Sequence, residues 1–285
     1  MGAGGAAASA ANLDVVPSLV GRLVAPGAVA CAVVLAAVSL LPTGGPAVAP
    51  RSAPRHHPVL HLNLPAFSFT NQGAAADDGI PPSPPAGSVY VATATVPSLP
   101  VYASPRALSS EQSLANPNPL GAPLTLLVDA VQGGWLQVYL PERPNEATGW
   151  VTATNVTLAT DAYRITVDLG ARQVSLYRDG TKLVTDSAAV GAPDSPTPTG
   201  HFFVTEDLQL TDPSGPYGPY ALGLSGFSNT YYSFEGGPGQ IAIHGTNQPW
   251  VIGGYASHGC VRLTNPDIAA LVQQVPAGTP VDIVN

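Results

Sequence analysis

Cys260 is the residue of this chain best suited to covalent chemistry, and it stands two positions after His258 and sixteen after His244. A cysteine acts as a nucleophile only as its thiolate, and a nearby imidazole can accept the thiol proton and then stabilise the charge. The chain's other cysteine, Cys31, lies inside an apolar run near the N-terminus. Exported proteins usually oxidise their thiols in pairs, so a single cysteine in the C-terminal part favours a chemical role.

The neighbours of Cys260 suit acyl transfer. Gly259 lets the backbone approach a substrate closely, and the N–H groups of residues 258–260 can point at an oxyanion. Arg262 adds a fixed positive charge, suited to binding a carboxylate or to steadying the loop. Two alternatives stay open: a buried cysteine in a tight glycine turn, and a zinc site that also uses both histidines. Structural zinc takes four ligands, and the sequence offers no fourth nearby, so we expect neither a metal nor a cofactor.

Short strands must position these side chains. His244 follows the run 240–243 (QIAI), mostly apolar, which predicts a strand that ends at the histidine. Alternating apolar and polar side chains also predict strands over 163–169, 173–177, 182–185 and 201–205, and Asp179-Gly180 predicts a hairpin turn. Residues 191–200 form a rigid loop, because three prolines fix φ there and remove hydrogen-bond donors.

One helix is predicted over residues 265–275. Asn265 is the expected N-cap, Pro266 suits the first turn, and the apolar residues that follow recur on one face. Pro276 ends the helix. Strands far outnumber helices, so a mainly β domain with one short helix is expected over residues 160–285.

The composition narrows the class of protein. The chain has 285 residues, with Lys+Arg 10 against Asp+Glu 18 and a net charge of −8. It has no lysine- or arginine-rich face, which argues against a nucleic-acid partner. Its 30 Gly and 31 Pro indicate many loops and short strands.

The N-terminal part predicts export. Residues 1–22 read as a cytoplasmic segment, and residues 23–41 carry no charge over a length that can span a bilayer as a helix. Residues 47–49 (AVA) resemble a signal-peptide cleavage site, but Pro50 would hinder that cut. A retained transmembrane anchor, a removed signal peptide and, less favoured, a lipid-modified Cys31 therefore remain as alternatives. All three place the rest of the chain outside the cytoplasm, in the cell envelope or wall.

Residues 42–87 are rich in Pro, Ala, Gly and Ser and predict an extended linker. Its three histidines, His56, His57 and His61, have no accompanying carboxylate or thiol. We therefore interpret them as polar linker residues and not as metal ligands.

Residues 88–159 consist of short strand-like runs separated by turn residues, as expected for a small barrel of antiparallel strands. Trp135 and Trp150 could line a ligand groove, but core and rim packing is the favoured interpretation. The runs 134–138 (GWLQV) and 149–151 (GWV) resemble a bacterial SH3-like domain. This resemblance says little about a ligand.

The C-terminal blocks resemble the L,D-transpeptidase (YkuD-type) catalytic domain. They are His244-Gly245, the run 257–263 (SHGCVRL), and 196–200 (PTPTG) followed by Phe202, in an order that covers about residues 161–285. Several separated blocks in the right order are more specific than one short motif. The resemblance implies a β-sandwich or barrel fold with one short helix, preceded here by the small SH3-like barrel.

The resemblance also implies a reaction. Cys260 would attack the carbonyl after the L-centre of meso-diaminopimelate, or its equivalent, in a peptidoglycan tetrapeptide stem. The terminal D-alanine would leave, and a thioester would form. An amine of a neighbouring stem would then resolve the thioester and give a 3→3 cross-link. Carbapenem-type β-lactams would be covalent inhibitors.

The resemblance also implies a role for each residue. His244 would be the general base, and the Gly245 carbonyl would orient its imidazole. His258 and Gly259 would shape the oxyanion pocket, Ser257 would brace the loop, and Arg262 would bind substrate. Family members often have a tyrosine-bearing lid, to which Tyr231, Tyr232 and Phe234 could belong, and Tyr232 is the expected substrate contact. His201 is interpreted as a surface strand residue.

Three other functions remain open. Water as the acceptor would make the protein an L,D-carboxypeptidase, and a protein amine would make it an enzyme that attaches proteins to the wall. A cell-wall binding module without catalysis is the third, although a pure binder has no need of a thiol.

Overall fold

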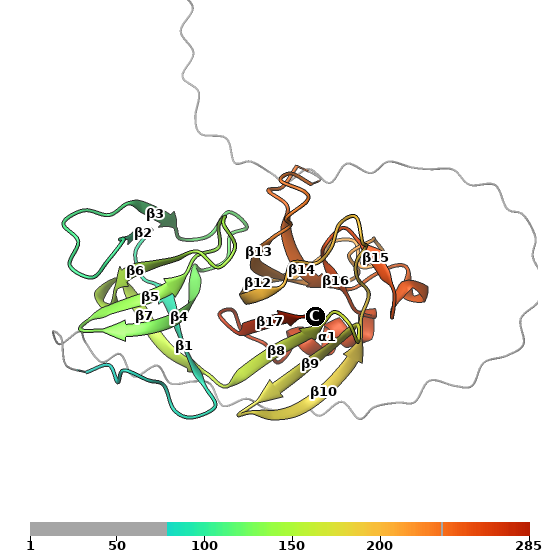
Figure 1. Cartoon of the computed structure of the whole chain (residues 1–285), viewed down its shortest axis with the longest axis horizontal. Helices are drawn as coiled ribbons and strands as arrows, with labels where there is room; N and C mark the ends of the chain where they lie inside the picture. The colour runs from blue at the N-terminus through green and yellow to red at the C-terminus, as the bar shows by residue number, and fades with distance from the viewer. Residues whose placement is uncertain (1–78, 235) are drawn as a thin grey trace, which may run out of the picture. The chain divides into compact units, whose positions relative to one another are not determined.

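The computed structural model describes residues 79–234 and 236–285 (Figure 1). The predicted cytoplasmic segment, the apolar run and most of the linker lie outside these residues. Within them, no helix is both long and apolar enough to cross a bilayer. The described part of the chain consists of strands with a single α-helix, which confirms the mainly β fold.

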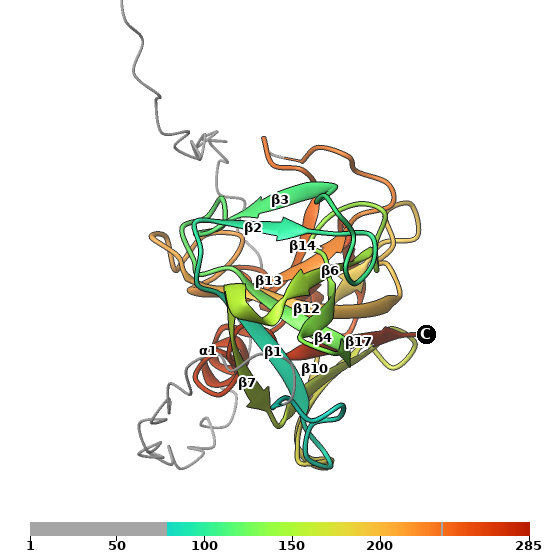
Figure 2. The same cartoon turned by 90° about the vertical axis from the view of Figure 1, so that its left-hand side faces the viewer.

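The first sheet has five antiparallel strands in the order β6-β5-β4-β1-β7. They are β1 (Val89–Ala94), β4 (Thr125–Gln132), β5 (Trp135–Tyr139), β6 (Thr148–Thr152) and β7 (Val156–Asp161). A ribbon of β2 (Ser98–Val101) and β3 (Gln112–Ala115) lies along β6 (Figures 1 and 2), joined by the bridge between Tyr102 and Trp150. Trp135 and Trp150 are half-buried, and the Trp135 ring packs edge-on against Tyr102.

The second sheet has eight strands in the order β10-β9-β8-β17-β12-β13-β14-β16. They are β8 (Tyr163–Asp168), β9 (Gln173–Arg178), β10 (Thr181–Ser187), β12 (Gly200–Gln209), β13 (Tyr220–Phe227), β14 (Gln240–His244), β16 (Val261–Arg262) and β17 (Pro280–Val284). The sheet curls (Figure 1), and one core cluster takes side chains from β8, β9, β12, β13, β14, β17 and the helix. A further short pair joins β11 (Val190–Gly191) to β15 (Tyr255–Ser257).

The predicted hairpin is confirmed. Between β9 and β10, Asp179 and Gly180 both have positive φ, at 50° and 73°. A two-residue turn of this kind matches the right-handed twist of the flanking strands, which is why Asp-Gly is a strong hairpin signal.

Two central strands, β13 and β17, were not predicted from the sequence. Seven of the eight residues of β13 are buried, so the strand has almost no polar side chain to mark an alternating pattern. β17 is short and begins at Pro280. A strand covered on both faces loses the period of two on which the sequence-based prediction depends.

The helix α1 (Asn265–Val272) is confirmed, but it ends three residues before the predicted end at residue 275, and the predicted N-cap is wrong. Thr264 is the N-cap, with extended φ and ψ, and its side chain accepts from the Asp267 N–H. Asn265 is instead the first helical residue, and its Oδ1 accepts from the Thr246 N–H at 2.8 Å. The correction has a functional consequence, because Asn265 thereby ties the helix to the loop that follows His244.

Both sheets belong to one compact unit. Phe203 of β12 is fully buried in the core cluster of the first sheet. Asn118 donates to Glu206 at 2.7 Å, and Glu146 accepts from the His201 N–H at 2.9 Å. Side chains of the first sheet can therefore act on the second.

Candidate active site

Parallel pairing of β14 with β16 brings the two predicted catalytic blocks together. The register places Ile243 opposite Val261 and His244 opposite Arg262. Ile243 and Val261 are fully buried in the core, and neighbouring side chains along a strand point to opposite faces. Cys260 directly precedes β16 and is half-buried as a thiol. The sheet therefore places the Cys260 backbone directly before the strand that pairs with the strand of His244.

The His244 ring is buried, with 2% of the residue exposed, and its Nδ1 lies 2.6 Å from the Gly245 carbonyl oxygen. A carbonyl oxygen can only accept, so Nδ1 carries the hydrogen and Nε2 holds the lone pair. The Tyr217 ring packs at a tilt against the imidazole, with 4.8 Å between the centroids and 56° between the ring planes. The imidazole is thus held in the tautomer that a general base requires.

Burial lowers the pKa of His244 from 6.5 to about 4, because the charged imidazolium would lose its hydration. The hydrogen bond to the Gly245 backbone raises this pKa, the positive charge of Arg262 lowers it, and a hydrogen bond to the Tyr217 backbone raises it. The net effect is a neutral imidazole at physiological pH, able to accept a proton.

Ser257 braces the loop that carries Cys260. Its Oγ donates to the Cys260 carbonyl oxygen at 2.5 Å and accepts from the Gly259 N–H at 3.2 Å. Gly259 has a φ of 120°, a conformation that residues with a Cβ rarely adopt. The Gly259 N–H, one of the three predicted oxyanion donors, is therefore held inside the loop.

Arg262 supplies a buried donor. Its Nε has no hydrogen-bond partner among the described residues, although Nη1 lies 3.5 Å from Gln248 Oε1. The Arg262 backbone is fixed by two hydrogen bonds to Ala189, at 2.7 and 2.9 Å. An unsatisfied guanidinium nitrogen is costly to bury.

The proline-rich loop lies beside the Cys260 loop, and β11 leads into it. The Gly191 N–H donates to Thr197 Oγ1 at 2.9 Å, and Ser195 Oγ donates to the Ser257 carbonyl oxygen at 3.2 Å. The first contact closes the proline-rich loop on itself, and the second joins that loop to the loop that carries Cys260.

Two aromatic side chains contact His258. The Tyr231 ring lies 5.6 Å and the Phe234 ring 5.2 Å from its imidazole, measured between centroids. Tyr232, the predicted substrate contact, is 72% exposed and lies under the Arg143 guanidinium at 4.8 Å. Tyr231 and Phe234 are thus the members of this group that reach the Cys260 loop, and the role of Tyr232 stays a prediction.

Sequence reasoning missed Tyr217 and Arg143. Tyr217 lies in the loop before β13, and Arg143 lies in the β5–β6 loop of the first sheet. Neither belongs to a periodic segment or to the motif around Cys260, so only tertiary contact reveals them.

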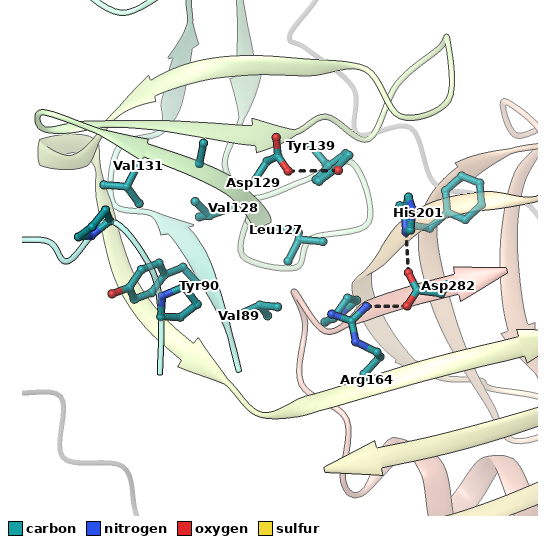
Figure 3. A pocket seen from close by; sticks show the side chains of 15 residues that line it. Val89, Tyr90, Leu127, Val128, Asp129, Val131, Tyr139, Arg164, His201 and Asp282 are labelled. Carbon is teal, nitrogen blue, oxygen red and sulfur yellow. Dashed lines mark hydrogen bonds and ion pairs between the residues drawn. The ribbon is translucent and has the colours of Figure 1, made fainter. Parts of the chain in front are cut away.

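A pocket of about 340 Å³ lies away from this site (Figure 3). Its lining is a mainly apolar wall with a charged end where Asp282 contacts Arg164 at 2.5 Å and His201 at 2.7 Å. His201 is exposed there, as expected for a surface strand residue. The pocket contains neither Cys260 nor His244, so the site is located by its residues and not by cavity volume. Across residues 79–234 and 236–285, no group of three or more His, Cys, Asp or Glu could hold a metal ion.

Comparison with known proteins matches the C-terminal part. Residues 162–283 match the family model of the L,D-transpeptidase catalytic domain, YkuD. The YkuD protein of Bacillus subtilis (strain 168), provisionally assigned as an L,D-transpeptidase, is 37% identical over 121 residues, or 42% of this chain and 65% of YkuD. YbiS of Escherichia coli (strain K12), with the same provisional assignment, is 40% identical over 80 residues, or 28% of this chain and 23% of YbiS.

Among solved structures, an L,D-transpeptidase from Mycobacterium smegmatis is 18% identical, covers 56% of this chain and 82% of its own, and gives a TM-score of 0.35. The chain thus spans just under two thirds of YkuD and about a quarter of YbiS. The match is one of domain, and residues 162–283 are similar to the catalytic domain of the L,D-transpeptidase (YkuD) family.

Proposed function

We propose that this protein is a peptidoglycan L,D-transpeptidase that forms 3→3 cross-links by acyl transfer through Cys260. The observation that carries the proposal is the buried imidazole of His244, whose Nδ1 is held by the Gly245 carbonyl, on the strand paired with the one that Cys260 directly precedes. The family of residues 162–283 supports the same reaction class.

In the first half-reaction, His244 Nε2 accepts the Cys260 thiol proton while the sulfur attacks the carbonyl carbon of the scissile peptide bond. The resulting oxyanion is stabilised by the backbone N–H groups of His258 and Cys260, since the Gly259 N–H already donates to Ser257 Oγ. Collapse of this intermediate breaks the C–N bond, and the imidazolium returns its proton to the departing D-alanine amine. A thioester on Cys260 remains, and His244 is neutral again.

In the second half-reaction, the amine of a neighbouring stem attacks the thioester carbonyl, and His244 accepts the proton that this amine loses. The C–S bond breaks, the new amide remains on the acceptor, and the thiolate recovers the proton from the imidazolium. The fixed positive charge of the Arg262 guanidinium suits a carboxylate of the donor stem.

Intact mass spectrometry with imipenem tests the nucleophile. The solved structures similar to this chain include an L,D-transpeptidase in complex with imipenem, which motivates this probe. Opening of the β-lactam ring by a thiol loses no atoms, so wild-type protein should gain one intact imipenem mass. Cys260→Ala should gain none, and an unmodified wild type would remove Cys260 from the proposed role.

Muropeptide analysis after incubation with disaccharide-tetrapeptide separates the possible acceptors. Cross-linked dimers with loss of D-alanine support transpeptidation, whereas tripeptides alone indicate an L,D-carboxypeptidase. Capture of a protein amine by the thioester indicates a wall-attachment enzyme. Binding of glycan with no change in its peptides indicates a cell-wall binding module.

We further propose that the protein acts outside the cytoplasm, anchored or secreted through residues 23–41, with an SH3-like domain over residues 88–159. The support is the uncharged length of the first segment and the strand and turn pattern of the second. Cell fractionation with N-terminal sequencing of the recovered protein tests both the location and the choice between anchor and signal peptide.

A further inference from the structure

Arg143, in the β5–β6 loop of the first sheet, reaches a loop of the second. Its Nη1 donates to the Pro238 carbonyl oxygen at 2.8 Å, and its Nη2 donates to those of Ser228 and Tyr231 at 2.9 and 3.2 Å. These acceptors belong to residues 228–234 and 236–239, between β13 and β14, named here the aromatic loop. One guanidinium therefore satisfies three carbonyls of a single loop.

Two aromatic rings also contact the Arg143 guanidinium. Its Cζ lies 4.8 Å from the ring centroid of Phe227 and 4.8 Å from that of Tyr232. Cation–π contacts of this kind contribute on the order of 0.5–1 kcal/mol at exposed sites and more when desolvated. A planar guanidinium can stack and donate at once, which an ammonium cannot do to the same extent.

Asn145 fixes the end of β13 at Phe227, one of the two residues whose rings contact Arg143. Its Nδ2 donates to the Phe227 carbonyl oxygen, and its Oδ1 accepts from the Phe227 N–H, both at 2.9 Å. The pair imitates one rung of a β-ladder. The aromatic loop therefore starts from a point that the first sheet holds.

The aromatic loop is folded so that its carbonyls converge. Ser228 Oγ accepts from the N–H groups of Thr230 and Tyr231, at 3.2 and 3.0 Å. Gly239 has a φ of 74°, and a Cβ there would collide with the Tyr231 carbonyl oxygen. Converging carbonyl dipoles repel one another, and a fixed cation at their meeting point offsets that repulsion.

The other side of the aromatic loop faces the predicted active site. Tyr231 and Phe234 contact the His258 ring. A Cβ built on Gly259 would lie 3.8 Å from Ser228 Oγ, so the base of the loop is in van der Waals range of the Cys260 loop. The aromatic loop thus lies between Arg143 and the Cys260 loop.

We propose that Arg143 is a positioning residue, through which the first sheet holds Tyr231 and Phe234 against His258 and so shapes the donor side of the predicted active site. The proposal rests on the proposed function for its kinetic consequence, but its structural part stands on the contacts alone. Arg143 touches no reacting atom, so its loss should weaken donor binding more than the chemical step.

Peptide-resolved hydrogen exchange on the full chain tests the structural part. In Arg143→Ala, the amides of residues 229–234 should exchange roughly tenfold faster than in wild type, while β12 and β13 keep their protection. Arg143→Lys retains the charge and should restore part of the protection. Arg106→Ala, at an exposed arginine of the same part of the chain, is the matched control and should change nothing.

Kinetics of imipenem acylation test the functional part. Arg143→Ala should raise the half-saturating imipenem concentration by roughly tenfold and change the limiting acylation rate by less than about threefold. Arg143→Lys should fall between wild type and Arg143→Ala. A merely structural defect would instead reduce the active fraction and leave the half-saturating concentration unchanged.

Each result decides. A local increase in exchange together with weaker imipenem binding supports the proposal. Unchanged exchange at residues 229–234 in folded Arg143→Ala overturns it, and so does an increase spread over both sheets, which would make Arg143 a general stabiliser. If wild-type protein is not acylated at all, the proposed function fails, and the exchange data still accept or reject Arg143 as the anchor of the aromatic loop.

Discussion

His244 donates its Nδ1 hydrogen to the carbonyl oxygen of Gly245, the next residue, over 2.6 Å. A backbone carbonyl thus takes the place that a carboxylate has in a Ser-His-Asp triad. It fixes the tautomer without placing a second charge beside the imidazole. A neutral partner leaves burial as the dominant influence on the ring, and the pKa of His244 is lowered accordingly.

Replacing His244 should impair acylation directly. His244→Ala removes the proposed base for the Cys260 thiol, and the acylation rate should fall several hundredfold, on the scale of losing a general base. Stopped-flow measurement of imipenem ring opening checks this. A loss smaller than about threefold would remove His244 from the role of base.

The pH dependence of acylation should show the lowered pKa of His244. The imidazole can accept a proton only while neutral, so activity should persist down to pH 5 and fall as the pH approaches about 4. A histidine of ordinary pKa would lose activity near pH 6.5. The measured values belong to the His244–Cys260 pair, because coupled groups titrate together. Rates measured from pH 3.5 to 8 locate the acid limb, and a midpoint near 6.5 would contradict the buried, neutral imidazole.

The same shift should appear in stability. The unfolded chain binds a proton at His244 below pH 6.5, whereas the folded chain does so only near 4. The free energy of unfolding therefore decreases as the pH falls from 6.5 to 4, by up to about 3 kcal/mol from this residue. Asp161 and Glu206 act in the opposite sense, because burial raises the pKa of each carboxyl and their contribution decreases as the pH rises.

Urea unfolding of wild type and His244→Gln at pH 7 and pH 4.5 isolates the contribution of His244 to the pH dependence of the free energy of unfolding. The glutamine variant should lose less stability between the two pH values than wild type does. Equal losses in both proteins would show that His244 does not titrate with a lowered pKa.

Much of this site follows from the sequence, but its supports do not. The order of the blocks around His244 and Cys260 predicts that they meet, and the Gly245 carbonyl lies where the family resemblance expects it. Arg143 and Tyr217 could not be found in this way, since each reaches the site from a loop without periodic pattern.

The N-cap shows how tertiary contact overrides local preference. Thr264 and Asn265 both have side chains suited to capping, and the sequence alone favours neither strongly. Asn265 Oδ1 accepts from the Thr246 N–H and does not cap the helix. Thr264 is therefore the N-cap. The choice depends on a loop 19 residues away in sequence, which no local pattern contains.

Removing the Ser257 hydroxyl should loosen the Cys260 loop. Ser257→Ala leaves the Gly259 N–H and the Cys260 carbonyl without the oxygen that joins them. Loss of such buried hydrogen bonds costs about 1–3 kcal/mol, so a tenfold or greater fall in acylation rate is expected. Imipenem kinetics together with thermal melting check this, and an unchanged rate in a folded variant would show that the brace is dispensable.

Gly245→Ala tests whether the carbonyl beside His244 must keep its position. A Cβ on Gly245 would collide with Asn265 Oδ1 and lie 3.1 Å from the Gly218 Cα and 3.2 Å from Ile268 Cγ2. Because helix α1 and the loop that contains Gly218 leave no room for this Cβ, the Gly245 backbone should shift. The hydrogen bond from His244 Nδ1 to the Gly245 carbonyl should then lengthen. Overpacking of this kind costs roughly 1–3 kcal/mol.

The expected result for Gly245→Ala is a lower limiting acylation rate, together with an acid limb that differs from that of wild type. Gly79→Ala is the matched control, since a Cβ there meets nothing within 4 Å. Wild-type kinetics and an unchanged pH profile in Gly245→Ala would mean that the carbonyl does not govern the imidazole. The orientation of His244 would then have to come from the Tyr217 ring, which lies 4.8 Å from it.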